Sequence, residues 1–271
     1  MTTAKPVALV TGASSGIGRA AAAAFVVAGF EVVGTSRNTS GVAPLDGVTF
    51  LDLDITSDES VRAVVGHAIE RFGRLDVLVN NAGTGAAGAA EESSVAQDQR
   101  VFDINFFGLV RMTKAVLPHM RAAGTGRIIN ISSVLGLVPA PYMASYAATK
   151  HAIEGYSESV DHEVREHGIR VLLVEPAYTR TGFDANAIQP DAPLPIYAVQ
   201  RQVFDGVIAR AMADGDDPAT VANAIVAAAT DPKPKLRYTA GPTAGRVSAL
   251  RRFVPTRVFD RQIRKLNHLP A

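Results

Sequence analysis

Residues 7–18 read Val-Ala-Leu-Val-Thr-Gly-Ala-Ser-Ser-Gly-Ile-Gly, and a run of alanines follows them. The apolar run Val7–Val10 predicts a buried strand, and the alanine-rich stretch predicts a helix. Glycines between a strand and a helix let the backbone turn tightly and approach a ligand closely. The helix start then offers free N–H groups and the positive end of its dipole to an anion. The stretch therefore predicts a turn that binds the phosphates of a dinucleotide.

Short apolar runs alternate with helix-like stretches along the rest of the chain. Expected strands are Val7–Val10, Glu31–Gly34, Thr49–Leu53, Val77–Val79, Arg127–Ile131 and Val171–Val174. Expected helices are Arg19–Ala28, Ser60–Phe72, Gln97–Ala122 and Ala147–His167. Apolar strands joined by helical crossovers indicate a parallel sheet that is buried on both faces. We therefore predict one doubly wound α/β domain.

Length and composition fit that prediction and exclude several other classes. The chain has 271 residues, of which 47% are hydrophobic and 20% charged, and it has no cysteine. Without cysteine, a disulfide scaffold, a thiolate nucleophile and a Cys-based zinc site are excluded. The net charge of +1 argues against a nucleic-acid partner. The sequence shows no signal-peptide pattern and no run of about 18 apolar residues, so we expect a cytoplasmic protein.

The glycine spacing is G-x-x-x-G-x-G, and with Thr11 before it this turn resembles the short-chain dehydrogenase/reductase family, whose fold is of the Rossmann type. Further family-like motifs follow in family order over residues 6–182. They are Asp54-Ile55, Asn80-Asn81-Ala82-Gly83, Asn105, Ser133, Tyr146-x-x-x-Lys150 and the segment from Pro176 to Thr181. The chain departs from the pattern at Ala177, where the family has glycine.

The residues Tyr146 and Lys150 suggest proton transfer even without the family. They are four apart in an expected helix, so they share a face one turn apart. A free phenol has a pKa of about 10 and is a poor acid–base catalyst near neutral pH. A neighbouring ammonium group favours the phenolate and lowers that pKa. Ser133 follows an expected strand, and ligands of such sheets bind at the carboxyl ends of the strands.

The resemblance implies a role for each member of this set. Tyr146 would exchange a proton with the carbonyl or alcohol oxygen of the substrate, and Ser133 would hydrogen-bond the same oxygen. Lys150 would bind the ribose of the nicotinamide and lower the pKa of Tyr146. Asn105 would hold a water that links Lys150 to solvent. The hydride transfer itself belongs to the nicotinamide cofactor.

The end of the second expected strand predicts which cofactor is bound. A carboxylate there would favour NAD(H), but the sequence reads Ser36-Arg37, and arginine suits a 2′-phosphate. We therefore favour NADP(H) over NAD(H). The expected cofactor-binding residues are Thr11, Gly12, Ser14, Ser15, Gly16, Ile17, Gly18, Ser36, Arg37, Asp54, Ile55, Asn81, Ala82, Gly83, Tyr146, Lys150, Pro176, Ala177, Thr179 and Thr181.

The expected function is hydride transfer between NADP(H) and a hydrophobic ketone or alcohol. The segment from about 182 to 217 is expected to form a helical lid, and Tyr142, Tyr178 and Phe183 to line the substrate site. The segments 150–159 and 236–238 are similar to those of hydroxysteroid and retinol dehydrogenase-like members. Two alternatives stay open: a 3-oxoacyl thioester reductase, and a catalytically silent NADP-binding redox sensor. No metal site is expected, because His162 and His167 are five apart, on different helix faces.

The C-terminal residues 241–271 differ in charge from the rest. They hold seven basic residues and one acid, a net charge of +6, whereas residues 1–240 carry 20 basic and 25 acidic residues. We expect a catalytic domain over 1–240 and a basic extension over 241–271. The extension is expected either to bind a membrane surface or to pack as a helix on the acidic body, its own or that of a partner. We favour packing, because Pro255 interrupts any long helix. The resemblance also implies a homodimer or homotetramer through the two long helices.

Overall fold

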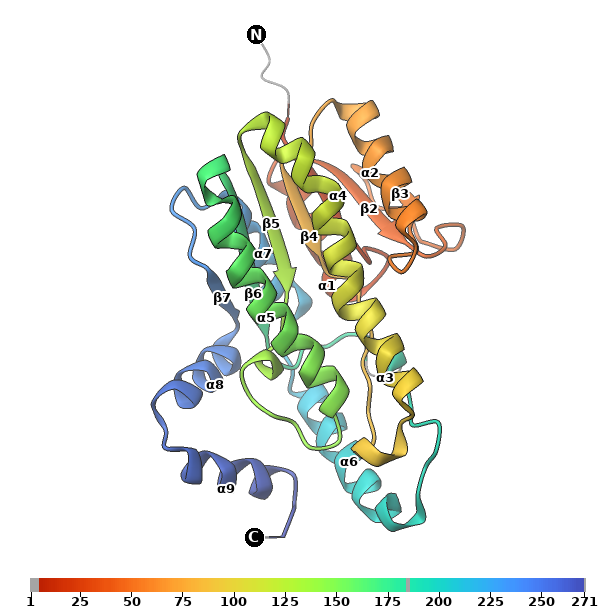
Figure 1. Ribbon diagram of the computed structural model, residues 1–271, viewed down its shortest axis with the longest axis vertical. Coiled ribbons are helices and arrows are strands. Elements are labelled where there is room, and N and C mark those ends of the chain that lie inside the picture. The colour runs from red at the N-terminus through yellow and green to blue at the C-terminus, as the bar shows by residue number, and fades with distance from the viewer. Residues whose placement is uncertain (1–4, 184–185, 271) are drawn as a thin grey trace.

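The computed structural model describes residues 5–183 and 186–270, and its core is a seven-stranded parallel sheet (Figure 1). The strands lie in the order β3-β2-β1-β4-β5-β6-β7. Their bounds are β1 Val7–Val10, β2 Glu31–Ser36, β3 Val48–Asp52, β4 Val77–Asn80, β5 Gly126–Ile131, β6 Ile169–Pro176 and β7 Arg237–Ala240. The order reverses at β1, which pairs with β2 on one side and β4 on the other. Ligands of such sheets bind at the crevice that this reversal creates.

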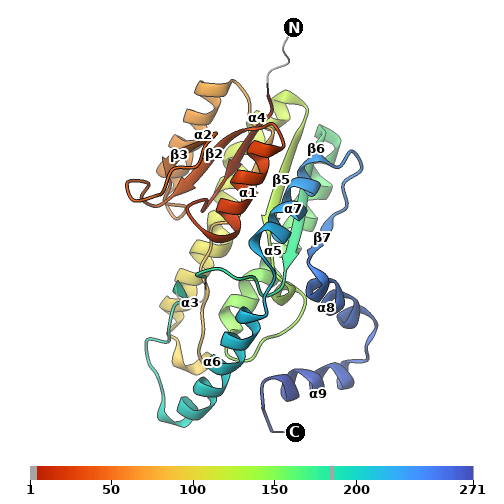
Figure 2. The same cartoon turned by 180° about the vertical axis from the view of Figure 1, so that it is seen from behind.

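Helices cover both faces of the sheet, as the strand sequences require. On one face lie α1 (Gly16–Val27) and α7 (Pro218–Thr230), which pack on Ala8 and Val10 of β1 (Figure 2). On the other lie α2 (Asp58–Phe72), α4 (Gly108–Ala123) and α5 (Ala144–Val164), which pack on Val7 and Leu9. Successive residues of a strand face opposite sides, so a strand covered twice is apolar throughout.

The remaining elements gather mostly at the carboxyl ends of the strands, toward the lower half of Figure 1. They are η1 (Ala90–Glu92), α3 (Val95–Phe102), the π-helical η2 (Asp103–Phe107), η3 (Val134–Gly136), η4 (Arg165–His167), η6 (Pro195–Tyr197), α6 (Ala198–Ala213), α8 (Pro242–Phe253) and α9 (Thr256–Leu266). The predicted lid region thus contains η6 and α6, and the basic extension contains α8 and α9.

The predicted doubly wound α/β fold is confirmed, with differences at several elements. The expected helix 97–122 corresponds to α3, η2 and α4, and the helix expected from Ala147 starts at Ala144. β7 was not predicted, because this short edge strand is half exposed and has no apolar run. α7 was not predicted either, although Asp217 before Pro218 is a recognisable helix start: the Asp217 side chain accepts a hydrogen bond from the Ala219 N–H.

The C-terminal helices α8 and α9 meet at Pro255, as the sequence predicted. They form an arm below β7 in Figures 1 and 2. The arm is only partly packed: Ala244 is buried in α8, and no residue of α9 is buried. The domain boundary at 240/241 stays a prediction. Within residues 5–183 and 186–270, every helix is too short or too polar to span a membrane.

Candidate active site

The glycine turn has the shape that a pyrophosphate requires. Gly12 and Gly16 have φ angles of 67° and 54°, a region that glycine adopts without strain. A Cβ on Gly18 would lie 2.2 Å from the carbonyl oxygen of Gly12, so α1 approaches the turn closely. Ser15 precedes α1 without capping it through its side chain. The N–H groups of the first helical turn are therefore available to an anion, and the turn fits a dinucleotide.

The second turn, at Asn81 and Ala82, is tied directly to the first. The Thr11 hydroxyl accepts hydrogen bonds from the N–H groups of Asn81 and Ala82, both at 3.0 Å. The Asn81 amide donates to the carbonyls of Thr11 and Gly12 at 2.9 and 3.2 Å. These hydrogen bonds join the turn after β1 to the turn after β4. Thr11 and Asn81 therefore fix the two turns relative to each other, and their direct contact with a cofactor stays a prediction.

At the end of β2, Ser36 is half buried and Arg37 is exposed. Among the described residues Arg37 has no hydrogen bond or ion pair, so its guanidinium is available to a ligand. Asp52 lies in register with Ser36, but the hydroxyl and N–H of Thr39 each donate to its carboxylate at 2.7 Å. These hydrogen bonds lower the pKa of Asp52. The pKa of Asp54 is lowered as well, chiefly by the hydroxyl of Thr56.

The candidate catalytic residues converge where β5 ends against α5. Tyr146 and Lys150 lie one turn apart in α5, and the Lys150 Nζ is 5.5 Å from the centre of the Tyr146 ring. The Lys150 Nζ also donates a hydrogen bond of 2.8 Å to the carbonyl of Ile131, two residues before Ser133. Ser133 is buried at the carboxyl end of β5 and accepts from the Leu135 N–H at 3.1 Å.

Lys150 has an electrostatic environment unlike that of a surface lysine. Its burial lowers the pKa to about 8, and the nearby carboxylate of Glu154 opposes that shift. The ammonium form therefore still prevails at pH 7. A charged lysine beside a phenol favours the phenolate in general, and proton exchange at the Tyr146 oxygen stays a prediction.

Asn105 lies in the π-helical turn η2, between α3 and α4, and is buried. Its side-chain oxygen accepts from the Thr84 N–H at 2.8 Å, and its amide donates to the Thr84 carbonyl at 2.9 Å and to the Thr149 hydroxyl at 3.3 Å. Asn105 thus joins the loop after β4 to α5, next to Lys150. Single π turns are frequent at functional sites. The water-relay role stays a prediction.

The segment after β6 folds back over the glycine turn. A Cβ on Gly16 would lie 3.1 Å from the Thr181 Cγ2, which places the end of this segment directly against the start of α1. The segment is held from outside by Asp216, whose carbonyl accepts from the Arg180 N–H and whose N–H donates to the Tyr178 carbonyl, both at 2.9 Å. Thr179 is buried, and its hydroxyl donates to the Ala177 carbonyl at 3.2 Å.

Aromatic side chains connect this site to the predicted lid segment. The rings of Phe183 and Tyr146 are 5.7 Å apart, so Phe183 lies beside the candidate catalytic phenol. Tyr142 has a φ of 62°, and its ring contacts Tyr197 and Phe204 of the lid at 6.5 and 5.7 Å. Strained residues of this kind cluster at ligand sites. Tyr178 lies in the segment after β6 and is exposed. The predicted lining residues thus border the site or the lid, and their contact with substrate stays a prediction.

Contacts that join η1 and the start of α3 to the predicted lid segment were not predicted from the sequence. Glu92 of η1 is buried; it accepts from the Leu194 N–H at 2.7 Å and pairs with Arg201 of α6. Burial alone would raise the pKa of Glu92, but hydrogen bonds from Leu194 and Ala89 and the charge of Arg201 lower it. Nearby, Asp191 accepts from the Ser94 N–H at 2.8 Å. Such contacts span about a hundred residues of chain, which periodicity does not reveal.

A buried pair of carboxylates, Glu154 and Glu175, lies behind the site and was also missed. Glu154 follows Lys150 by one turn of α5, and Glu175 immediately precedes Pro176. Arg237 of β7 approaches both, with its Nε 3.0 Å from Glu154 and 3.3 Å from Glu175. Within the described structure, neither Glu175 oxygen has a hydrogen-bond partner. Burial, and then the charge of Glu154, raise the pKa of Glu175 to about 7 despite Arg237.

This raised pKa predicts how stability depends on pH. In the unfolded chain a glutamate titrates near about 4.3, so the folded state binds the Glu175 proton more tightly. The contribution of the Glu175 proton to the free energy of unfolding is complete below pH ~4.3 and is lost as pH rises through about 7. In Glu175→Gln the side chain cannot ionise. Its change in Tm relative to wild type should therefore be more favourable at pH 8 than at pH 5, by about 2–4 °C or more.

Thermal unfolding at the two pH values measures this difference. Glu158→Gln is the matched control, because Glu158 also pairs with Arg237, at 3.1 Å, but is half exposed. The control should show nearly the same change in Tm at both pH values. If Glu175→Gln behaved like Glu158→Gln, the raised pKa of Glu175 would be wrong.

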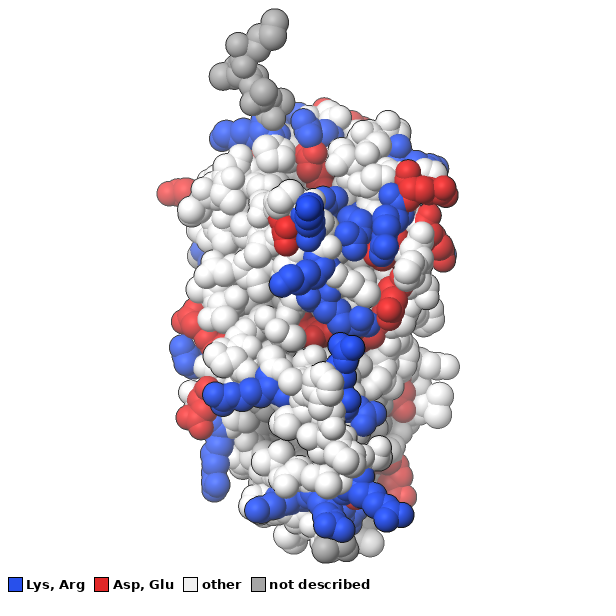
Figure 3. Space-filling model, turned by 90° about the vertical axis from the view of Figure 1, so that its left-hand side faces the viewer, with Lys and Arg blue, Asp and Glu red and all other residues white. Residues whose placement is uncertain are grey.

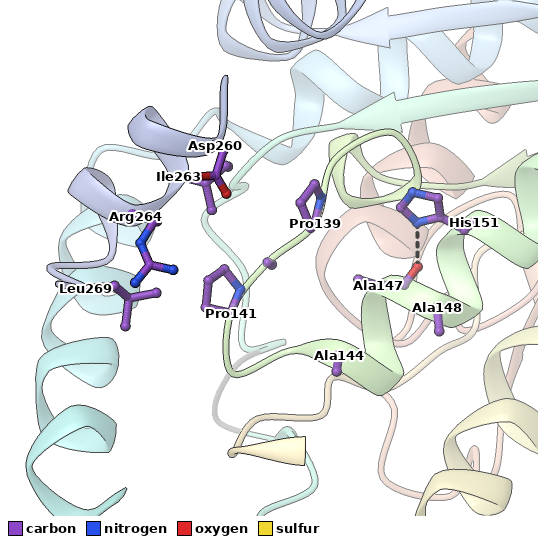
Figure 4. Close-up of a pocket in the computed structure, with 11 residues that line it drawn as sticks. Pro139, Pro141, Ala144, Ala147, Ala148, His151, Asp260, Ile263, Arg264 and Leu269 are labelled. Carbon is purple, nitrogen blue, oxygen red and sulfur yellow. Dashed lines mark hydrogen bonds between the residues drawn. The ribbon is translucent and has the colours of Figure 1, made fainter. Parts of the chain in front are cut away.

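Two cavities of the described structure lie away from the candidate catalytic residues. One, of about 460 Å³, separates α9 from the start of α5, and Ala147 and His151 rather than Tyr146 and Lys150 form its α5 wall (Figure 4). The other, of about 510 Å³, runs between α4 and α5 and is lined by Phe106, Lys114, Leu117, Ala152, Gly155, Tyr156, Ser159, Val160 and Glu163. Neither is the substrate site that the catalytic geometry suggests.

Comparisons with known proteins agree with this geometry. The family model described as short chain dehydrogenase matches residues 6–192. A 3-ketodihydrosphingosine reductase of Bacteroides thetaiotaomicron is 46% identical over 178 residues, which span 66% of this chain and 65% of that protein. A short-chain dehydrogenase structure from Streptomyces avermitilis is 37% identical with a TM-score of 0.81, covering 93% of this chain and 95% of that one. A 3-ketoacyl-(acyl-carrier-protein) reductase from Brucella melitensis, complexed with NADH, is 27% identical with a TM-score of 0.74, covering 88% and 99%.

Proposed function

Because the chain belongs to the short-chain dehydrogenase/reductase family of oxidoreductases, we propose that it transfers a hydride between NADP(H) and a hydrophobic ketone or alcohol, with Tyr146 as acid and base. The observation that carries this proposal is the convergence of Tyr146, Lys150 and the end of β5. The two hydrogen-bonded turns after β1 and β4 lie at the same edge of the sheet. The nicotinamide, when bound, supplies the hydride chemistry.

Each member of the set has a task that its contacts support. Tyr146 gives a proton to the carbonyl oxygen during reduction and takes one from the alcohol during oxidation. Lys150, anchored on the Ile131 carbonyl, keeps a positive charge beside the phenol. Ser133 donates to the reacting oxygen and stabilises the charge that develops there. Asn105 keeps the loop after β4 against α5 and, with Lys150, is proposed to pass the proton toward solvent through water.

Cofactor choice is proposed to rest on Arg37. Its exposed guanidinium offers several donors to a 2′-phosphate, while the Thr39 hydroxyl and N–H bind the carboxylate of Asp52. Wild-type enzyme should then prefer NADPH to NADH in kcat/KM. Arg37→Asp should lower kcat/KM for NADPH by about 10- to 100-fold, from a charged hydrogen bond of about 1.5–3 kcal/mol, and should raise the value for NADH.

Steady-state kinetics with both cofactors test this prediction. Arg62→Asp makes the same charge change on the exposed surface of α2 and should leave the cofactor ratio nearly unchanged. A wild-type preference for NADH would contradict the proposal. An equal fall of kcat/KM with NADPH and with NADH in Arg37→Asp would mean that Arg37 supports the fold and does not select the 2′-phosphate.

The substrate is proposed to be a long, apolar ketone. Phe183 beside Tyr146, and Tyr142 against Tyr197 and Phe204, provide the apolar walls. The name of the relative from Bacteroides thetaiotaomicron points the same way. The 3-ketoacyl-(acyl-carrier-protein) reductase neighbour keeps a 3-oxoacyl thioester as the second candidate.

A panel of carbonyl substrates tests the function as a whole. Oxidation of NADPH is followed with aliphatic ketones of increasing chain length, steroid ketones, retinaldehyde and 3-oxoacyl thioesters. We expect kcat/KM to rise with the chain length of the apolar ketone. Preferential turnover of the thioester would favour the second candidate. Tight NADPH binding without turnover of any panel member would favour a catalytically silent redox sensor.

We also propose a homo-oligomer formed through α4 and α5. The groove between these helices is lined by apolar residues such as Phe106 and Tyr156, and Phe107 beside it is half exposed. An exposed apolar groove on two long helices is a typical contact between subunits. Nucleic acid is not proposed as a partner.

A further inference from the structure

The arm formed by α8 and α9 concentrates charge and exposed apolar surface at one end of the molecule. Four of the ten large hydrophobic residues that are exposed within the described residues belong to it: Leu250 (52% exposed), Phe253 (77%), Val258 (46%) and Leu266 (64%). Figure 3 shows Lys and Arg gathered at the lower end of the face that carries the arm. Packing on the body of the chain, which the sequence favoured, therefore leaves much of the arm uncovered.

The basic residues of the arm also lack acidic partners. Within the described part of the chain, none of Arg246, Arg251, Arg252, Arg257, Arg261, Arg264 and Lys265 forms an ion pair. The guanidinium groups of Arg251 and Arg252 lie instead over the rings of Phe259 and Phe253, at 5.4 and 5.6 Å. The acidic residues of the body do not neutralise the arm.

Basic and apolar residues alternate on the outward faces of the two helices. In α8 the outward face lies opposite the buried Ala244, where helical spacing places Arg246, Leu250 and Phe253 together. In α9 the inward side is marked by Asp260, Ile263 and Arg264, which line the cavity against Pro139 and Pro141 (Figure 4). Helical spacing then turns Val258, Arg261 and Lys265 outward.

The contact between α9 and the body is correspondingly loose. The cavity of about 460 Å³ lies between them, and the arm is fastened at α8 by a hydrogen bond of 3.1 Å from Arg251 to the Leu137 carbonyl. A helix that has no buried residue, and that mixes arginines with large exposed apolar side chains, is unusual on a globular surface. These features match a helix that lies in the interface of a bilayer.

We propose that the α8–α9 arm docks the protein on the surface of an anionic lipid bilayer. Phe253, Leu250 and Leu266 enter the boundary between headgroups and acyl chains, and the arginines bind the phosphates of anionic lipids. An acidic protein would attract the same charges, but the four exposed apolar side chains favour a lipid surface. The docking does not depend on the substrate proposed above.

Docking would also orient the enzyme. The arm lies at the same end of the molecule as the lid helix α6 and the carboxyl ends of the strands (Figures 1 and 2). A protein attached through the arm presents this end to the bilayer. An apolar ketone dissolved in the bilayer would then have a short path to the site, a consequence that does rest on the proposed function.

Vesicle flotation of the full chain tests the docking. The probes are vesicles of phosphatidylcholine alone and vesicles containing about a third phosphatidylglycerol, at low and high salt. We expect binding to the anionic vesicles that falls with salt. Arg257→Glu with Arg261→Glu should reduce the partition coefficient about 25-fold or more, from about 1 kcal/mol, or fivefold, for each basic residue. Phe253→Ser with Leu266→Ser should also reduce it strongly.

Matched variants keep the test specific. Arg62→Glu with Arg121→Glu repeats the charge reversal on α2 and α4, and Val27→Ser with Val95→Ser repeats the loss of exposed apolar side chains on α1 and α3. Both controls should float like wild type, and circular dichroism checks that every variant is folded. Three results would each overturn the proposal. They are no flotation with anionic vesicles at low salt, equal flotation with neutral vesicles, and arm variants that change the oligomeric mass but not vesicle binding.

Discussion

Replacing Tyr146 by phenylalanine should lower kcat by about 10²- to 10⁴-fold, the range that a positioned general acid or base contributes. The substitution removes one oxygen and keeps the ring, so the contact of 5.7 Å with Phe183 is retained. Lys150 keeps its hydrogen bond to Ile131, because that bond does not involve the phenol. Binding of NADPH, measured by fluorescence titration, should therefore change little while turnover is lost.

Tyr156→Phe is the control for this prediction. Tyr156 lies in the same helix, α5, and its ring packs against Phe106 at 5.7 Å, away from the catalytic residues. Loss of its hydroxyl should leave kcat within about a factor of two to three of wild type, because Tyr156 lines the groove between α4 and α5 and not the candidate catalytic site. Near-normal turnover in Tyr146→Phe would refute the acid–base role of Tyr146.

The second large effect is expected from Gly18→Ala, which adds one methyl group where α1 meets the glycine turn. The new Cβ would lie 2.2 Å from the Gly12 carbonyl oxygen and 2.5 Å from the Asn81 amide nitrogen. Real contacts are never this short, so the helix start or the turn must move. Overpacking of this kind costs about 1–3 kcal/mol, and here the displaced atoms are those that hold the two turns together. Cofactor binding should weaken together with stability.

Gly66→Ala, in the interior of α2, is the matched control, because its Cβ would meet no atom within 4 Å. Alanine exceeds glycine in helix propensity by up to about 1 kcal/mol, so this variant should be slightly more stable than wild type. Thermal unfolding and NADPH titration distinguish the two variants. Normal cofactor affinity in Gly18→Ala would show that the close approach of α1 to the turn is not needed for binding.

The elements that could be predicted are those whose residues are determined by their own strand or turn. The apolar run Val7–Val10 and the glycines after it predicted β1, the turn and α1, because burial on both sheet faces and positive φ angles leave direct marks on the residues. The edge strand β7 left no such mark. It is half exposed and holds only four residues, so its pairing with β6 depends on the sheet already being formed.

Residue pairs of the candidate site within one helix could be predicted, but contacts between different elements could not. Spacing identified Tyr146 with Lys150 as neighbours, because four residues make about one helical turn. Spacing could not show that Glu175 faces Glu154, since β6 and α5 are brought together only by the tertiary fold. One sign was available: a glutamate that follows the apolar run Val171–Val174 directly and precedes Pro176 is unusual enough to suggest a buried polar partner.

The π-helical turn η2 has a further consequence for how residues can be added to or removed from this part of the chain. α3, η2 and α4 follow one another without a break from Val95 to Ala123, and the wide turn takes up one more residue than an α-helical turn would. Deleting a residue between Asp103 and Phe107 would therefore convert η2 to ordinary α-helix and shift the register between α3 and α4. Met112 and Val116 could then face the sheet as before only if Asn105 lost its place beside Thr84. The π-helical turn thus lets Met112 and Val116 face the core while Asn105 faces Thr84, although a regular α-helix could not place all three residues in this way.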